Sequence, residues 1–193
     1  MDVIDMLAGI AAGSPLDAIR AGRPQARQHA QATHEALFRP RDEADATLAE
    51  RYAVACFVAR LHAQPEIAAF YAKGLESKPA LQEAVRTAAA TAEAEGPYGR
   101  YPKGPLSTED QPGAAHRTAE PLRRDLGERL AAALDHAHML VFHPRDASPA
   151  HLQALLDAGW STTGIVVLSQ LVAFLSYQTR AVTGLRVLQA SPA

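Results

Sequence analysis

Three side chains of one predicted helix have the chemistry to move protons or to attack a peroxide: Glu50, Cys56 and His62. Histidine exchanges protons near neutral pH, and a carboxylate can relay a proton. A cysteine thiolate is a nucleophile toward peroxides. Glu50 and His62 are twelve residues apart, about 18 Å along a helix, so we expect no contact between them. The three residues are therefore candidate catalytic groups with separate roles.

Each candidate also has a structural alternative. A buried free cysteine such as Cys56 behaves as a small hydrophobic side chain. Glu50 suits the first turn of a helix or an ion pair. His62 lies one turn before Pro65, where it can hydrogen-bond helix-end carbonyls or face a cavity. The residue types leave these alternatives open.

The eight histidines do not have the spacing of a metal site. His136 and His138 are two residues apart and are expected on different sides of a helix. His29 and His34 are five apart, and Pro144 indicates that a helix ends next to His143. No Cys-x-x-Cys, His-Glu-x-x-His or acidic loop pattern is present, so we expect neither a metal nor a cofactor. The chain also lacks the Gly-x-Ser-x-Gly pattern, so the sequence does not indicate a serine hydrolase.

Composition predicts one domain over residues 1–193, because 193 residues with 48% hydrophobic side chains can bury a sizeable core. A net charge of −2 and 6% aromatic residues give no basis for nucleic-acid binding. The single cysteine fits a reducing compartment. The longest apolar run, residues 164–177, is shorter than the ~20 residues of a membrane span. We expect a cytoplasmic protein without a membrane partner.

Capping patterns divide the chain into helices and predict an all-α fold. Residues 1–44 are expected as an amino-terminal helical extension and residues 45–190 as the core. Ser14 and Pro15 are typical of a helix start, and Gly22 of its end. The other predicted helices cover residues 24–38, a core run from about 46 to 71 with a new turn at Pro65, 79 to about 96, about 118–141, 149–159 and 162–188.

The segment 96–113, GPYGRYPKGPLSTEDQPG, is predicted to be a long loop because its glycines and prolines interrupt any regular element. Loops of this length in compact domains are often functional. Tyr98 lies in this loop, and it can belong either to a binding lid or to a subunit contact.

The last predicted helix has two apolar seams. A helix that is apolar on most sides is enclosed by protein. We therefore expect a homo-oligomer through residues 162–188, with another subunit covering the second seam. Tyr177 and Arg180 on this helix are expected either to specify the oligomer or to line a small cavity for a small-molecule ligand.

Two stretches carry a family resemblance: ERYAVACFVARLHAQPEIAAFY, residues 50–71, and DHAHMLVFHP followed by the long apolar helix. Together they resemble the alkylhydroperoxidase D-like (AhpD-like), or carboxymuconolactone decarboxylase, superfamily, in its peroxidase-related branch. The resemblance covers roughly residues 45–190. It implies an AhpD-like helical bundle and an antioxidant, peroxidase-type oxidoreductase activity.

Members with peroxidase activity carry a Cys-x-x-Cys pair and a following histidine. In this chain those positions are Gln64, Ile67 and Tyr71, which are expected to line the inherited site but cannot run the dithiol cycle. Three hypotheses follow. The protein is an antioxidant enzyme that uses Cys56, or a thiol-independent decarboxylase- or isomerase-like enzyme in which His62 acts on a small carboxylate or lactone, or a non-catalytic oligomeric ligand-binding module.

Overall fold

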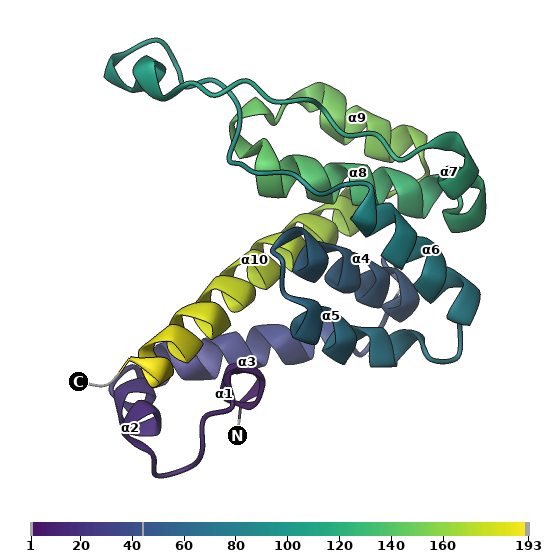
Figure 1. Ribbon diagram of the computed structural model, residues 1–193. Helices are drawn as coiled ribbons and strands as arrows, with labels where there is room; N and C mark the ends of the chain where they lie inside the picture. The colour runs from purple at the N-terminus through teal and green to yellow at the C-terminus, as the bar shows by residue number, and fades with distance from the viewer. Residues whose placement is uncertain (1, 44, 192–193) are drawn as a thin grey trace.

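Helix α10 (Thr162–Ala190) crosses the molecule from end to end, and the other helices pack along it (Figure 1). The computed structural model describes residues 2–43 and 45–191. Residues 1, 44, 192 and 193, which include the last residue of the predicted extension, lie outside it. Ser161 caps α10 because its hydroxyl accepts a hydrogen bond from the Gly164 amide.

The all-α prediction is confirmed, since the described residues form helices and no strand. Near the amino terminus Ser14 caps a helix and Gly22 ends it, as predicted. The helices preceding α10 are α1 (Val3–Ala8), α2 (Pro15–Ala21), α3 (Pro24–Phe38), α4 (Leu48–Leu61), α5 (Pro65–Ala72), α6 (Pro79–Ala90), α7 (Glu120–Leu126), α8 (Glu128–Phe142) and α9 (Pro149–Asp157), with short 3₁₀ helices at Lys73–Leu75, Pro105–Glu109 and Pro144–Asp146.

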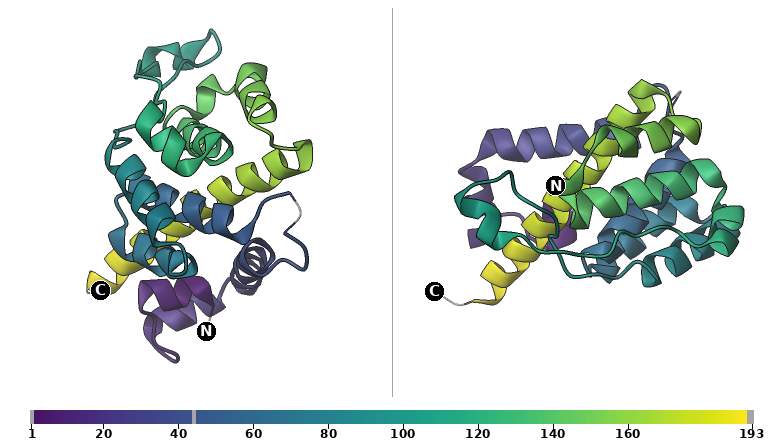
Figure 2. Two further views of the ribbon diagram at one scale, coloured as in Figure 1. Left: turned by 90° about the vertical axis from the view of Figure 1, so that its right-hand side faces the viewer. Right: turned by 90° about the horizontal axis from the view of Figure 1, so that it is seen from above.

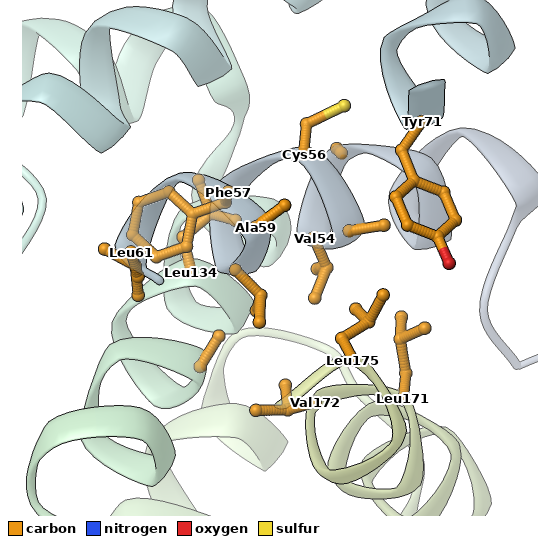
Figure 3. Packing of buried hydrophobic residues seen from close by; sticks show 14 of the residues in the cluster. Val54, Cys56, Phe57, Ala59, Leu61, Tyr71, Leu134, Leu171, Val172 and Leu175 are labelled. Carbon is orange, nitrogen blue, oxygen red and sulfur yellow. The ribbon is translucent and has the colours of Figure 1, made fainter. Parts of the chain in front are cut away.

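Helix α4 forms the centre of the core. It begins with a capping box in which Thr47 and Glu50 satisfy each other's backbone amides. Its side chains are buried on nearly every side, because α5, α6, α8 and α10 all contact it. Figure 3 shows Val54 facing Leu171 and Leu175 of α10, while Cys56 points away from α10. The crossing of α4 and α10 therefore determines which polar residues of the two helices lie next to each other.

Helices α1–α3 lie at the opposite end of the molecule from α7–α9 (Figures 1 and 2). Both α1 and α3 contact α10, and Leu171, Phe174 and Leu185 of the second seam pack into the core of this one chain. This one chain therefore buries Leu171 and Phe174 of the second seam, while Leu188 of the same seam is exposed. The homo-oligomer stays a prediction, and Val166, Tyr177, Val187 and Leu188 are the exposed apolar side chains of α10.

The predicted helix 118–141 is broken into α7 and α8 at Gly127, whose φ of 78° lies in the left-handed region. Glycine adopts this conformation without the steric cost of a Cβ atom. The break turns the chain so that Arg123 of α7 reaches Glu128 and Asp135 of α8. The sequence did not indicate this break, because the residues on both sides of Gly127 favour a helix.

The Gly/Pro-rich segment 96–113 is largely irregular, as predicted, except for the 3₁₀ helix Pro105–Glu109. It projects beyond the ends of α8 and α9 (Figure 1). Residues 114–118 then return along α8: the Ala114 carbonyl lies 3.1 Å from His143 Nε2, and the Thr118 amide donates to Asp135 at 2.7 Å. We call residues 114–118 the strap.

Helix α10 has 29 residues and is the one described helix that is long and apolar enough to cross a membrane. The sequence pattern identified only a fourteen-residue apolar run, because residues 161–163 and the residues after Tyr177 are more polar. Half of the most apolar window of α10 is buried inside the molecule. A helix in the core of a folded protein can be equally long and apolar.

Candidate functional site

His62 forms the carboxyl-terminal cap of α4, and its Nε2 atom lies 3.1 Å from Ser176 Oγ on α10. The chain turns sharply here, since Ala63 has a φ of 53°. Burial, and to a smaller extent the positive charge of Arg180, lower the pKa of His62 to about 4. At neutral pH the imidazole is therefore uncharged and keeps one nitrogen lone pair.

Arg180 and Gln64 lie beside this histidine. Together with His62, Thr179 and Thr183 they line a pocket of about 250 Å³. No carboxylate is among the lining residues, and no ion pair to the Arg180 guanidinium occurs in the described part of the chain. An accessible guanidinium without an acidic partner is suited to bind a carboxylate or another anion.

Glu50 is not part of this pocket. Besides its capping box it accepts a hydrogen bond from Arg129 Nε at 2.7 Å. Arg129 also donates to the Asp45 carbonyl, and its guanidinium lies 4.0 Å from the ring centre of Trp160. These contacts join the start of α4 to α8 and to the turn before α10. Glu50 therefore positions helices, as its structural alternative predicted.

Cys56 is buried, and its sulfur lies 3.6 Å from the Ala68 carbonyl oxygen. Burial raises the pKa of the Cys56 thiol to about 12. Almost no thiolate is then present at neutral pH, and the thiolate is the reactive form. The geometry gives Cys56 the properties of a core side chain.

Ile67 and Tyr71 are both fully buried in the core beside α4. The Tyr71 hydroxyl donates to Gln178 Oε1 at 2.6 Å, which ties α5 to α10. Burial also raises the pKa of Tyr71 well above its usual value. Neither residue contacts the pocket of His62, so two of the three positions given by the resemblance are core positions.

The two remaining predicted tyrosines lie elsewhere. The Tyr98 ring packs 5.0 Å from the ring of His143, and its amide donates to the Phe142 carbonyl. Tyr177 is exposed and lines an open groove between α3 and α10. Of the nine predicted site residues, the structure brings together His62, Gln64 and Arg180.

A second pocket, of about 350 Å³, was not predicted from the sequence. It lies between the strap, α8 and α9, and we call it the histidine pocket. Its floor is one face of α8, formed by Ala132, Met139 and His143. His136 and His138 flank this face, and His116 of the strap and His151 of α9 complete the set. His136 and His138 project from different sides of α8, as expected, but both line this one pocket.

Most of these histidines are buried. Burial, and to a smaller extent the nearby histidines, lower the pKa values of His136 and His138 to about 4. The rings of His116 and His138 stack with centres 4.6 Å apart. A sequence signal did exist: three histidines occur within DHAHMLVFH, on a helix whose alanines indicate close packing.

Within residues 2–43 and 45–191, no group of three or more histidine, cysteine, aspartate and glutamate side chains has an arrangement that could hold a metal ion. The rings of His116 and His138 are inclined by only 26° to each other, so their in-plane lone pairs do not converge on one point.

No protein-family model, curated protein or solved structure matches this chain.

Proposed function

We propose that this protein is a thiol-independent acid–base enzyme that acts on a small carboxylate or lactone, and that it is a member of the AhpD-like superfamily that has lost the thiol chemistry. His62 exchanges the proton, Ser176 orients it, and Arg180 binds the carboxylate. The observation that carries the proposal is the convergence of His62, Gln64 and Arg180 on one pocket, with Ser176 in contact with the imidazole.

The state of His62 supports a role as a base. Because the pKa of His62 is about 4, the ring holds a free lone pair at neutral pH. A weakly basic ring is a poor proton acceptor, however, since a general base works best with a pKa near the operating pH. A bound carboxylate offsets the charge of Arg180, the smaller of the two causes that lower the pKa of His62, and so raises this pKa from its lowered value. Substrate binding thus makes His62 a stronger base.

Two facts argue against the thiol hypothesis. Cys56 is the only cysteine of the chain, so no second thiol can resolve a sulfenic acid. Its burial and its raised pKa leave almost no nucleophilic thiolate. We expect the native protein to react with a thiol-specific disulfide reagent far more slowly than the urea-unfolded protein. Fast native labelling, together with hydroperoxide consumption that Cys56→Ser abolishes, would restore the thiol hypothesis.

The binding part of the proposal is tested with glycolate as the probe. Glycolate should shift the ring signals of His62 in the NMR spectrum of ¹⁵N-histidine-labelled protein, and Arg180→Gln should weaken binding at least about tenfold, the loss expected for a charged hydrogen bond. Arg186→Gln is the matched control, because Arg186 lies on the same helix but is paired with Glu66. Equal effects of the two variants would refute the role of Arg180.

The catalytic part is tested by deuterium uptake from D₂O into a panel of small 2-oxo and 2-hydroxy acids, followed by NMR. We expect uptake with the wild type and none with His62→Gln, which should still bind glycolate. Uptake that persists in His62→Gln excludes His62 as the base. Binding without uptake by the wild type favours the non-catalytic ligand-binding module.

A further inference from the structure

We propose that two copies of this chain associate through the solvent-exposed face of α10, with the two α10 helices packed antiparallel. One row of exposed side chains carries the inference, and we call it the outer seam. Its central members are Val166, Gln170, Ala173, Tyr177, Arg180 and Gly184, and Thr163 and Val187 continue it at the two ends. The association is independent of the proposed enzymatic function.

The outer seam has the period of a coiled coil. Its members alternate at intervals of three and four residues from one end to the other, which is the heptad spacing that lets two helices pack along one line. The seam faces away from the core, since Leu171 on the other side of α10 is buried. Val166, Tyr177 and Val187 are 55%, 46% and 60% exposed, so apolar side chains occur along the whole seam, a length of ~36 Å.

Gly184 gives a second, independent indication of a partner. Glycine inside a helix is destabilising relative to alanine, and Gly184 lies within α10 rather than at its end. Among the described residues, a Cβ atom at this position would meet no heavy atom within 4 Å outside its own stretch of helix. The packing of this one chain therefore does not require a glycine here, whereas the close approach of a second molecule does.

The sizes of the side chains complement each other when two copies are antiparallel. In a two-fold dimer each contact occurs twice, because the same surface is used by both copies. One antiparallel register aligns the two outer seams over their full length. Val166 then faces Gly184 of the second copy, and Ala173 faces Tyr177 of the second copy. Each large side chain thus lies against a small one.

Charge also favours this register. Arg180 is the only charged residue between positions 162 and 185. In the antiparallel register it faces Gln170 of the second copy, whose amide oxygen is an acceptor for the guanidinium. The two Arg180 residues are then ~15 Å apart along the helix axis, beyond the screening length of ~8 Å in physiological salt. Because Arg180 also lines the pocket of His62, Gln170 of the second copy lies at the edge of that pocket.

Other arrangements of the two helices are less favourable. Parallel helices in register place the two Arg180 side chains against each other and Tyr177 against Tyr177. An antiparallel shift of one heptad in one direction brings the two Arg180 residues within ~5 Å along the axis. The shift in the other direction leaves Gly184 and Val187 beyond the first residue of the other α10. The full-length antiparallel register avoids both defects.

Sedimentation equilibrium tests the association. We expect the wild type to form a dimer with a Kd below ~100 µM. Ala173→Glu puts a carboxylate without a partner into the centre of the seam, so it should weaken dimerisation at least about tenfold. Ala80→Glu is the matched control, because Ala80 is exposed on α6, and it should leave dimerisation unchanged. A wild type that is monomeric at ~100 µM, or equal effects of the two variants, would overturn the inference.

Disulfide cross-linking tests the direction and register of the helices. Two variants, Val166→Cys and Gly184→Cys, are made in a Cys56→Ala background so that each chain carries one thiol. An oxidised mixture of the two should contain cross-linked dimers, because these positions face each other in the antiparallel register. Neither variant alone should cross-link, because equivalent positions are ~27 Å apart, whereas a disulfide needs Cα atoms within ~7 Å.

Both cysteine variants should fold, because Val166 is exposed and a side chain at position 184 enters open space. Cross-linking of Val166→Cys with itself would indicate parallel helices and overturn the inference. So would a mixture that gives no more cross-linked dimer than either variant alone. Neither experiment uses a substrate, so a failure of the acid–base proposal leaves their outcome unchanged.

Discussion

His62 Nε2 and Ser176 Oγ lie 3.1 Å apart although 114 residues separate them in the chain. The pair joins the end of α4 to the middle of α10, and it places the imidazole beside Arg180. Because both partners are polar and partly buried, the contact contributes to stability as well as to the proposed chemistry.

Removal of the Ser176 hydroxyl should measurably destabilise the fold. We expect Ser176→Ala to lower the free energy of unfolding by about 0.5–1.5 kcal/mol, the net value of a hydrogen bond, in urea denaturation followed by circular dichroism. Ser169→Ala is the matched control, because the Ser169 hydroxyl lies 3.5 Å from His136 and makes only a weak contact. Equal losses in the two variants would show that the contact between Ser176 and His62 contributes no more stability than the weak contact between Ser169 and His136.

Tyr71 and Gln178 should behave as a coupled pair. Tyr71→Phe leaves a buried amide oxygen without its donor and should cost about 1–3 kcal/mol. Gln178 Nε2 already has no partner among the described residues, so Gln178→Leu in the Tyr71→Phe background should recover part of that loss. A double-mutant cycle by urea denaturation gives the coupling energy. Strictly additive losses would contradict direct coupling.

Stability should fall as the pH drops from about 6.5 to 4. In this window the unfolded chain binds protons at His136 and His138, whereas the folded protein does not, because burial lowers both pKa values to about 4. Each histidine lowers the free energy of unfolding by about 1.36 kcal/mol for each pH unit in this window. Over the whole window the loss is at most ~3 kcal/mol for each histidine. Their contribution is constant above pH 6.5.

The measurement is the urea midpoint as a function of pH. His138→Phe should show a shallower slope between pH 6.5 and 4, while the control His29→Gln, at an exposed position, should keep the wild-type slope. A slope that is unchanged in His138→Phe would mean that this histidine is already protonated in the folded state.

Arg27 should matter more for stability than a surface arginine. It bonds Asp2 at 2.9 Å and Asp17 at 2.7 Å and also contacts Asp5. Asp2 and Asp5 are buried, so Arg27→Ala leaves carboxylates with only Arg20 to balance them. We expect a loss of about 1–3 kcal/mol, less than for a fully buried pair because Arg27 is partly exposed.

Arg86→Ala is the control for this prediction. Arg86 pairs with Glu83 on the surface of α6, where both side chains are more than half exposed, and such pairs contribute about 0–1 kcal/mol. Thermal unfolding of the two variants side by side gives the comparison. Similar melting temperatures would show that the amino-terminal ion-pair cluster adds nothing beyond a surface pair.

The sequence by itself determined the all-α class and most helix starts, whereas the helix predicted to continue to about residue 96 ends at Ala90. Ser14, Ser161 and the prolines at helix starts act on amides within three residues of themselves, so their effects can be read without the fold. The same local reasoning included, among its alternatives, the places that the structure gives to Cys56, a buried side chain, and to Glu50, in the first turn of its helix.

Tertiary structure alone decided which polar residues meet. His62 reaches Arg180, and His116 reaches His138, because α10 crosses α4 and the strap lies along α8. It also placed Ile67 and Tyr71 in the core and packed α1 and α3 against α10. The physical reason is that capping depends on neighbours in sequence, whereas pockets depend on how helices pack across long chain separations, which helical periodicity does not specify.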